Sequence, residues 1–91
     1  MKCIVIIPAL NEEKTIAGVL DAVPVSLFGG KVYLDKVVVD DGSTDLTSRI
    51  AEEHGAAVIR HGTPQGVGSA FWSGIREALR RKADFAVNID A

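Results

Sequence analysis

The residues of this sequence that could do chemistry fall in four short segments. Each segment is rich in carboxylates or glycine: Asn11 with Glu12, the pair Asp40 and Asp41, Gly66 with Gly68, and Asp90. Carboxylates accept hydrogen bonds from ribose hydroxyls and from the N–H groups of a nucleobase. They also hold hard cations such as Mg²⁺ or Mn²⁺ through oxygen. Because carboxylates repel a bare phosphate, a nucleoside diphosphate would bind beside them only with a cation that bridges its phosphates.

Each segment on its own also fits a purely structural role. Asp40-Asp41-Gly42-Ser43 fits a turn that leads into a helix cap, and Asn11-Glu12-Glu13 fits a helix N-terminus. Gly66-x-Gly68 lacks the Lys-Ser/Thr of a P-loop and does not follow the first strand, so a tight turn with close helix packing is its alternative role. His54 and His61 have no third metal ligand spaced near them and are expected on the surface.

Runs of apolar, β-branched residues predict four strands that are buried in a parallel sheet. They are Cys3–Ile7, Val37–Val39, Ala56–Arg60 and Phe85–Ile89. Helical spacing of apolar residues predicts helices between them, which run from Glu12 to Ala22, from Asp45 to His54, and from Val67 onward. The order βαβαβαβ predicts a three-layer α/β/α fold with a parallel, Rossmann-like sheet.

The third helix has the clearest pattern. Its expected buried stripe consists of Val67, Ala70, Phe71, Gly74, Ile75, Ala78 and Leu79. We expect Glu77 to pair with Arg81 on the polar side. Cys3 and Trp72 are expected to be packing residues, and residues 25–33 are expected to form a loop.

The four polar segments all follow predicted strands. In an open parallel sheet, ligands bind outside the carboxyl ends of the strands. The segments are therefore expected to meet at one edge of the sheet, where they would form a site for a polar ligand. Each motif alone is weak evidence for a ligand site, but their expected convergence at one edge makes the evidence strong.

Composition limits the other possibilities. The 91 residues (9.6 kDa) allow one small domain, and the formal charge of −2 argues against nucleic-acid binding. The single cysteine, Cys3, excludes an intrachain disulfide and a Cys-rich zinc site. The longest apolar run, Cys3 to Leu10, is too short to span a membrane, and no signal peptide is recognised. We therefore expect a cytoplasmic location, which for a longer parent could be the cytoplasmic face of a membrane.

Four motifs resemble a known family in order along the chain. Ile7-Pro8-Ala9-Leu10-Asn11-Glu12-Glu13 and Val37-Val38-Val39-Asp40-Asp41-Gly42-Ser43-Thr44-Asp45 resemble the first two signatures of inverting family 2 glycosyltransferases, which have the GT-A fold. Gly66-x-Gly68-x-Ala70-x-x-x-Gly74 resembles the third, and Val87-Asn88-Ile89-Asp90-Ala91 resembles the start of their Asp-x-Asp motif. The branch that the chain most resembles is that of the dolichyl-phosphate mannose synthase-like, polyprenyl-phosphate glycosyltransferases.

The resemblance implies a site and a reaction. Residues 1–91 would be the nucleotide-sugar-binding N-terminal half of a GT-A domain. The donor would be a UDP- or GDP-sugar that carries a hexose such as mannose or glucose, the acceptor a polyprenyl phosphate, and the reaction an inverting displacement assisted by Mg²⁺ or Mn²⁺. Asp90 would contact the ribose or the metal. The donor-binding residues would be Pro8, Ala9, Leu10, Glu12, Val39, Asp40, Asp41, Gly66 and Asp90.

The sequence departs from the family pattern at two places. Leu10 stands where many relatives have an aromatic residue, and Ala91 is followed by no second Asp. The acceptor-binding half and the catalytic base are therefore expected beyond residue 91, and this chain alone is expected to be a poor catalyst. The last predicted strand would then be an open apolar edge, through which we expect the chain to self-associate.

Two alternative functional classes use a similar sheet. A nucleotidyltransferase would carry a Gly-rich loop with Arg or Lys after the first strand, where this chain has Pro8-Ala9-Leu10-Asn11. A flavodoxin-like signalling domain of the response-regulator type would need an acidic pair after the first strand and a phosphate acceptor after the third. In this chain the first strand ends at Pro8 and the third at Arg60-His61.

Overall fold

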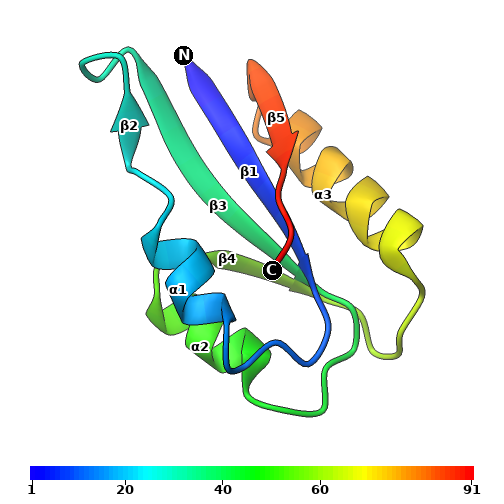
Figure 1. The fold of residues 1–91 in the computed structure, drawn as a ribbon. Helices are drawn as coiled ribbons and strands as arrows, with labels where there is room; N and C mark the ends of the chain where they lie inside the picture. The colour runs from blue at the N-terminus through cyan, green and yellow to red at the C-terminus, as the bar shows by residue number, and fades with distance from the viewer.

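A computed structural model describes residues 1–91 as a sheet with helices on both faces (Figure 1). In chain order the elements are β1 (Lys2–Ala9), α1 (Ile16–Asp21), β2 (Ser26–Leu27), β3 (Val32–Asp40), α2 (Thr47–Glu53), β4 (Ala57–Arg60), α3 (Val67–Arg80) and β5 (Phe85–Asn88). This is the predicted α/β architecture with a Rossmann-like, mostly parallel sheet, and it has one additional short strand.

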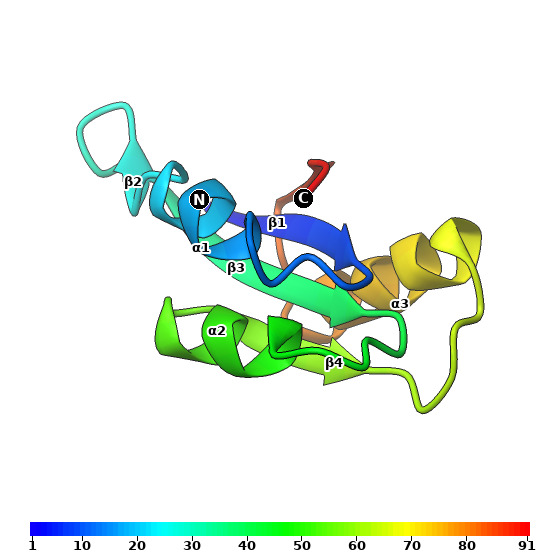
Figure 2. The same ribbon diagram turned by 60° about the horizontal axis from the view of Figure 1, so that its bottom comes forward.

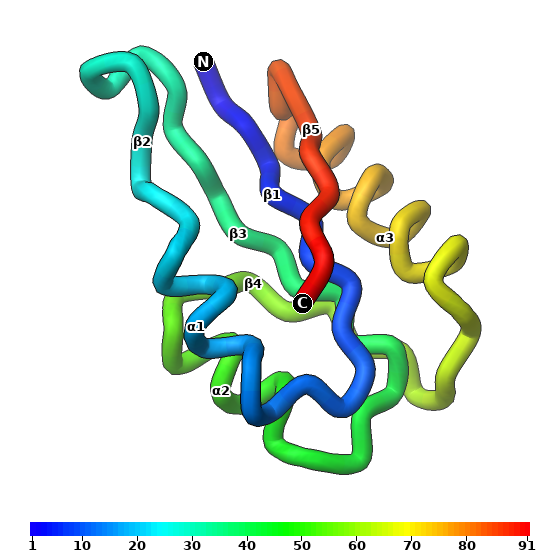
Figure 3. Tube along the Cα trace, in the orientation of Figure 1, coloured from blue at the N-terminus to red at the C-terminus, as the bar shows by residue number.

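The sheet is parallel except for β2. The path of paired strands is β2-β3-β1-β5, and β4 pairs with the carboxyl half of β3. The register places Ala9 beside Asp40 and Asp40 beside Arg60, so β1, β3 and β4 end side by side. This alignment brings the loops after these strands to one end of the molecule (Figure 3).

Strand β1 is buried on both faces, as its continuous apolar sequence predicts. Val5 and Ile7 pack in one core cluster with residues of α1 and α2. Ile4 and Ile6 pack in a second cluster with residues of α3. The alternation of side chains along the strand thus divides the core into two layers.

Helix α3 confirms its predicted start and the Glu77–Arg81 ion pair, but part of its buried stripe is wrong. Val67 and Leu79 are 76% and 73% exposed, while Ser73 is buried. The reason is close packing along a narrow row of small residues: a Cβ at Gly74 would collide with the Ile6 side chain. Side chains at the margins of this row project away from the sheet.

The two single residues that were predicted to pack differ in outcome. Cys3 is buried, and burial raises the pKa of its thiol. Trp72 is 59% exposed, so its predicted packing role is wrong. The indole lies off the small-residue row and contacts Phe71 edge to face instead.

The predicted helix starts are too early. Helix α1 begins at Ile16 and not at Glu12, and α2 begins at Thr47 and not at Asp45. Asn11 does not cap α1, because its side-chain oxygen accepts a hydrogen bond from the Thr44 amide across the site. Long-range contacts between two loops therefore replace the expected local cap.

Residues 25–33 are more ordered than the predicted loop. They contain β2 and the first residues of β3, joined by a turn in which Phe28, Gly29 and Gly30 have positive φ. Figures 1 and 2 show this hairpin projecting beyond the helices. Among the helices of the structure, none combines the length and the apolar character that crossing a membrane requires.

Candidate functional site

The loops at the carboxyl ends of the strands enclose a cleft of about 360 Å³, which is within the range of small-molecule sites. The loop after β1 forms one wall, and the segment before α3 with the first turn of this helix forms another. The cleft is lined by Pro8, Ala9, Leu10, Glu12, Asp41, Pro64, Gly66, Val67, Ala70, Asp90 and Ala91. The predicted convergence of the polar segments is thereby confirmed.

Seven of the nine residues that were predicted to bind the donor line this cleft. Val39 and Asp40 do not, because both are fully buried. Sequence reasoning missed four lining residues: Pro64, Val67, Ala70 and Ala91. Ala70 was visible in the helical stripe, but its sequence position gave no sign that this part of the stripe reaches the cleft.

Asp40 is held inside the protein. One oxygen accepts a hydrogen bond from the Ser43 amide at 2.8 Å, and the other accepts one from the Ser48 hydroxyl. The Arg60 guanidinium lies 3.5 Å from the second oxygen. Burial acts to raise the pKa of Asp40, but the accepted hydrogen bonds and the Arg60 charge outweigh it, so the pKa lies below its usual value.

Asp41 is held on the cleft wall. Its Oδ1 accepts hydrogen bonds from His61 Nδ1 and from the Gln65 amide, both at 2.8 Å, and its Oδ2 accepts one from the Gly66 amide at 2.9 Å. Burial acts to raise its pKa, but these hydrogen bonds outweigh it and keep the pKa low. A carboxylate offers about four acceptor positions, so one position on Oδ2 remains for a ligand.

His61 is not the surface residue that the sequence predicts. Its side chain is 9% exposed, and its second ring nitrogen, Nε2, lies 2.9 Å from Ser73 Oγ. The reason is that the chain after β4 turns inward beneath α3, where Asp41 and Ser73 satisfy both nitrogens. His54 is partly exposed and contacts Asp21 at 2.9 Å.

The loops after β1 and β3 are joined by reciprocal hydrogen bonds. The Ser43 hydroxyl accepts a hydrogen bond from the Asn11 amide, and the Thr47 hydroxyl accepts one from the Glu12 amide. In return, Glu13 Oε2 accepts a hydrogen bond from the Leu46 amide. These contacts fix the loop that carries Leu10 and Glu12, so the polar residues of the first signature include structural ones.

Asp90 is the exposed carboxylate at the C-terminal side of the cleft. No group of three or more His, Cys, Asp or Glu side chains is arranged to hold a metal ion by itself. Mg²⁺ and similar cations are commonly held by one or two carboxylates together with substrate phosphates. A single carboxylate at the cleft mouth therefore fits a cation that arrives with a nucleoside diphosphate.

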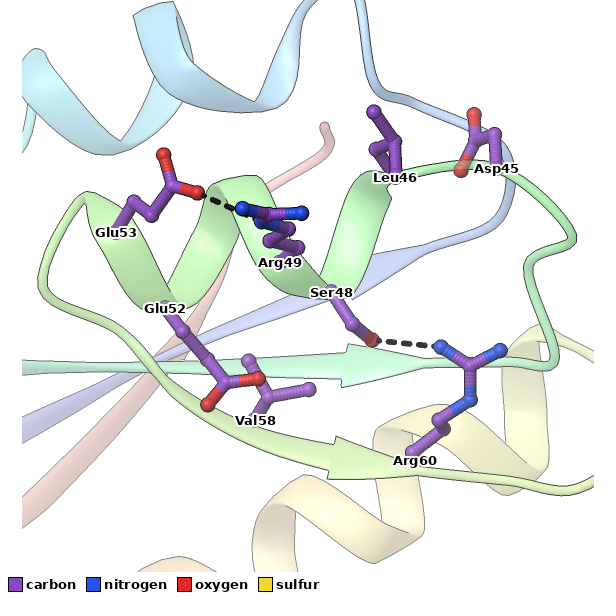
Figure 4. Close-up of a pocket in the computed structure, with 8 residues that line it drawn as sticks. All are labelled: Asp45, Leu46, Ser48, Arg49, Glu52, Glu53, Val58 and Arg60. Atoms are coloured by element: carbon purple, nitrogen blue, oxygen red, sulfur yellow. Dashed lines mark hydrogen bonds and ion pairs between the residues drawn. The ribbon is translucent and has the colours of Figure 1, made fainter.

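A second hollow, of about 540 Å³, lies between α2 and β4 (Figure 4). Its lining is mostly charged, but its two arginine side chains already have partners within the protein. Arg49 pairs with Glu53 at 3.2 Å, and Arg60 contacts Ser48 and the Ser43 carbonyl. The strand ends do not meet in this hollow, and the cleft is the better candidate for a ligand site.

Comparison with known proteins agrees with the motifs. Residues 4–91 match the family Glycosyl transferase family 2. The chain belongs to this family. Membership in glycosyl transferase family 2 decides against the nucleotidyltransferase and the flavodoxin-like signalling domain.

Two curated relatives show how much of a longer protein the chain resembles. It is 41% identical over 87 residues to the uncharacterized protein MJ1222 of Methanocaldococcus jannaschii, covering 96% of this chain and 34% of the relative. It is 36% identical over 86 residues to 4,4'-diaponeurosporenoate glycosyltransferase of Staphylococcus aureus, covering 89% and 22% respectively. The chain thus spans about a third of the first relative and about a fifth of the second.

Two solved structures share the fold. Glucosyl-3-phosphoglycerate synthase from Mycobacterium tuberculosis, in complex with Mn²⁺, UDP and glucosyl-3-phosphoglycerate, superposes with a TM-score of 0.75 at 35% identity, covering 98% of this chain and 33% of that one. TarS of S. aureus superposes with a TM-score of 0.81 at 30% identity, covering 99% and 16%. Neither comparison supports the dolichyl-phosphate mannose synthase-like branch in particular.

Proposed function

We propose that residues 1–91 are the donor-binding part of a glycosyltransferase that uses a UDP-sugar and a divalent cation. The observation that carries the proposal is the position of Asp41. Its carboxylate stands on the wall of a cleft that six other predicted donor-binding residues line, and it keeps one acceptor position open.

Five of the cleft residues have a proposed part in donor binding. Pro8, Ala9 and Leu10 offer an apolar wall for the nucleoside, and the free position on Asp41 Oδ2 accepts an N–H from the base. Asp90 would hold the cation, which when bound neutralises the charge of the departing diphosphate. Because the pKa of Asp41 is low, this carboxylate is ionised at neutral pH and accepts without donating.

The choice of UDP over GDP rests on relatives. Glucosyl-3-phosphoglycerate synthase was solved with UDP and Mn²⁺, and in another structure with UDP-glucose. Calorimetric titration of this chain with UDP and with GDP, each with and without Mn²⁺, tests the proposal. We expect UDP to bind and Mn²⁺ to strengthen its binding. Tighter binding of GDP would overturn the base assignment, and absence of binding to both would overturn the donor-binding proposal for this chain.

The acceptor proposed here is a polyprenyl phosphate, on the basis of the motif resemblance to the dolichyl-phosphate mannose synthase-like branch. The names of the relatives point to different acceptors, so the acceptor must be tested directly. A longer polypeptide that contains this chain should transfer glucose from labelled UDP-glucose to a polyprenyl phosphate. Transfer to 3-phosphoglycerate alone would contradict the proposed acceptor. A cytoplasmic location is part of the same proposal, and cell fractionation would test it.

Strand β5 is proposed to mediate self-association of this chain. All four of its residues are exposed, including Phe85 at 49% and Val87 at 45%, and one of its edges has no partner strand. Open apolar edges pair with strands of other molecules. Light scattering at rising concentration should show dimers or larger species, and Val87→Lys should reduce them. A monodisperse monomer at high concentration would contradict this proposal.

A further inference from the structure

A chain of four polar side chains links α3 to the cleft wall. Arg76 donates a hydrogen bond to Ser73 Oγ at 3.1 Å, and Ser73 Oγ lies 2.9 Å from His61 Nε2. His61 Nδ1 in turn lies 2.8 Å from Asp41 Oδ1. Ser73, His61 and Asp41 are buried, and no buried polar side-chain atom in the structure lacks a partner.

The direction of each hydrogen bond follows from chemistry. A guanidinium only donates, so Ser73 Oγ accepts from Arg76 and keeps its own proton to donate. His61 Nε2 is the acceptor within reach of that proton. An ionised carboxylate only accepts, so His61 must carry a proton on Nδ1 to bond with Asp41. In this arrangement every bond of the series points from Arg76 toward Asp41, and His61 carries a proton on Nδ1.

The order Ser–His–Asp invites comparison with a nucleophilic triad, but the surroundings of the serine argue against one. Ser73 is 6% exposed, and its oxygen already accepts a hydrogen bond from Arg76. A nucleophile needs an accessible oxygen beside space for the reacting group. Asp41 is the member of this hydrogen-bonded series that reaches the cleft. The series therefore acts on this carboxylate and not through the serine.

We propose that His61 is a positioning residue for donor binding: its Nδ1–H holds Asp41 Oδ1, so that the free acceptor position on Oδ2 faces the nucleobase. Ser73 and Arg76 fix the His61 tautomer that makes this possible. The inference rests on the proposed function, since it assigns a cause to the orientation of the base-binding carboxylate. A charge-assisted hydrogen bond of this kind is among the stronger ones in proteins.

Two substitutions at His61 separate positioning from packing. In His61→Asn the amide nitrogen can take the place of Nδ1 and still donate to Asp41. In His61→Gln the amide reaches toward Ser73 and leaves Asp41 Oδ1 without this donor. We expect His61→Gln to weaken binding of UDP by about tenfold and His61→Asn to weaken it by less than about threefold. Manganese pyrophosphate, which lacks the base, should bind both variants and the wild type equally.

The outcomes of this titration distinguish the two proposals. Equal loss of UDP binding in both variants would overturn the positioning role. A loss of pyrophosphate binding in His61→Gln as large as its loss of UDP binding would overturn it too. Failure of the wild-type chain to bind UDP would overturn the proposed function instead. Thermal unfolding followed by circular dichroism shows whether each variant is folded.

A spectroscopic measurement tests the inference without ligand and without substitution. Nitrogen-15 NMR of the imidazole in the wild-type chain should show that His61 carries a proton on Nδ1. In Ser73→Ala the imidazole loses its Nε2 partner, and we expect a measurable population of the other tautomer. A wild-type His61 protonated only on Nε2 could not donate to Asp41 and would overturn the inference, whatever the binding data show.

Discussion

Asp40 and Asp41 are neighbours in sequence, yet they belong to different regions of the molecule. Asp40 is directed to the α2 side, where Ser43, Ser48 and Arg60 surround it. Asp41 is directed to the α3 side, where it meets His61 and the Gly66 amide. Both pKa values are lowered, but only Asp41 lines the cleft.

The difference follows from the period of the strand. Side chains of a strand alternate between the two faces of the sheet. Val38 packs in the α1–α2 layer, and Val39 packs in the α3 layer. Asp40 continues the first series and Asp41 the second. Two adjacent carboxylates at the end of a strand can therefore have different roles, because one binds the neighbouring loops and the other faces a ligand.

The largest expected effect is on stability, at Asp40. Removal of this carboxylate in Asp40→Ala leaves the Ser43 amide and the Ser48 hydroxyl without their acceptor. We expect a loss of about 3 kcal/mol in the free energy of unfolding, measured by urea denaturation. Asp21→Ala, which removes an exposed carboxylate, should change stability by less than about 0.5 kcal/mol. Similar losses in the two variants would contradict the structural role of Asp40.

The next effect is at Gly42, which follows the acidic pair. Gly42 has φ of +88°, and a Cβ there would lie 2.7 Å from the Pro64 nitrogen. Gly42→Ala should therefore cost about 2 kcal/mol of stability. It should also weaken UDP binding, because the displaced segment carries the Gly66 amide that holds Asp41.

Gly68→Ala is the matched control for this substitution. Nothing lies within 4 Å of a Cβ at Gly68, although the sequence suggested close helix packing for the Gly66-x-Gly68 segment. The control should leave UDP binding unchanged. It should not reduce stability either, since alanine has a higher helix propensity than glycine. Equal effects of the two substitutions would show that the contact with Pro64 is unimportant.

A smaller effect is expected on acid stability. Asp40 and Asp41 have pKa values below those of the unfolded chain, so their contribution is present above the unfolded pKa and is lost as pH falls through the folded one. Glu77 adds to this, because hydrogen bonds from Arg80 and Arg81 lower its pKa to about 2. Thermal melts from pH 6 down to pH 2 should show declining stability, with a shallower decline in Glu77→Gln. Identical pH profiles for the wild type and Glu77→Gln would contradict this.

The sequence predicts the strands and their convergence because both follow from local chemistry. The β-branched run from Cys3 to Ile7 specifies a buried strand, and parallel connections then place all the strand ends together. The alternation of side chains along a strand also predicts that Asp40 and Asp41 point to opposite faces of the sheet. Which of the two faces the cleft depends on which helix covers each face, and the sequence pattern does not specify that.

The missed features depend on contacts between distant residues. Asn11 bonds with Thr44, which is 33 positions away, and His61 bonds with Asp41, which is 20 positions away. No local pattern indicates such partners, so the sequence predicts a helix cap for Asn11 and a surface position for His61. Tertiary hydrogen bonds here override local preferences.

Titration with UDP in the presence of Mn²⁺ tests the central claim most directly, when the wild type is compared with Asp41→Asn and Asp40→Asn. Both variants keep the size of the side chain, and circular dichroism first confirms that each is folded. We expect Asp41→Asn to weaken UDP binding by at least about tenfold, and Asp40→Asn by less than about threefold. Equal weakening in the two variants, or a larger loss at Asp40, would contradict the assignment of one carboxylate to the ligand and the other to the loops.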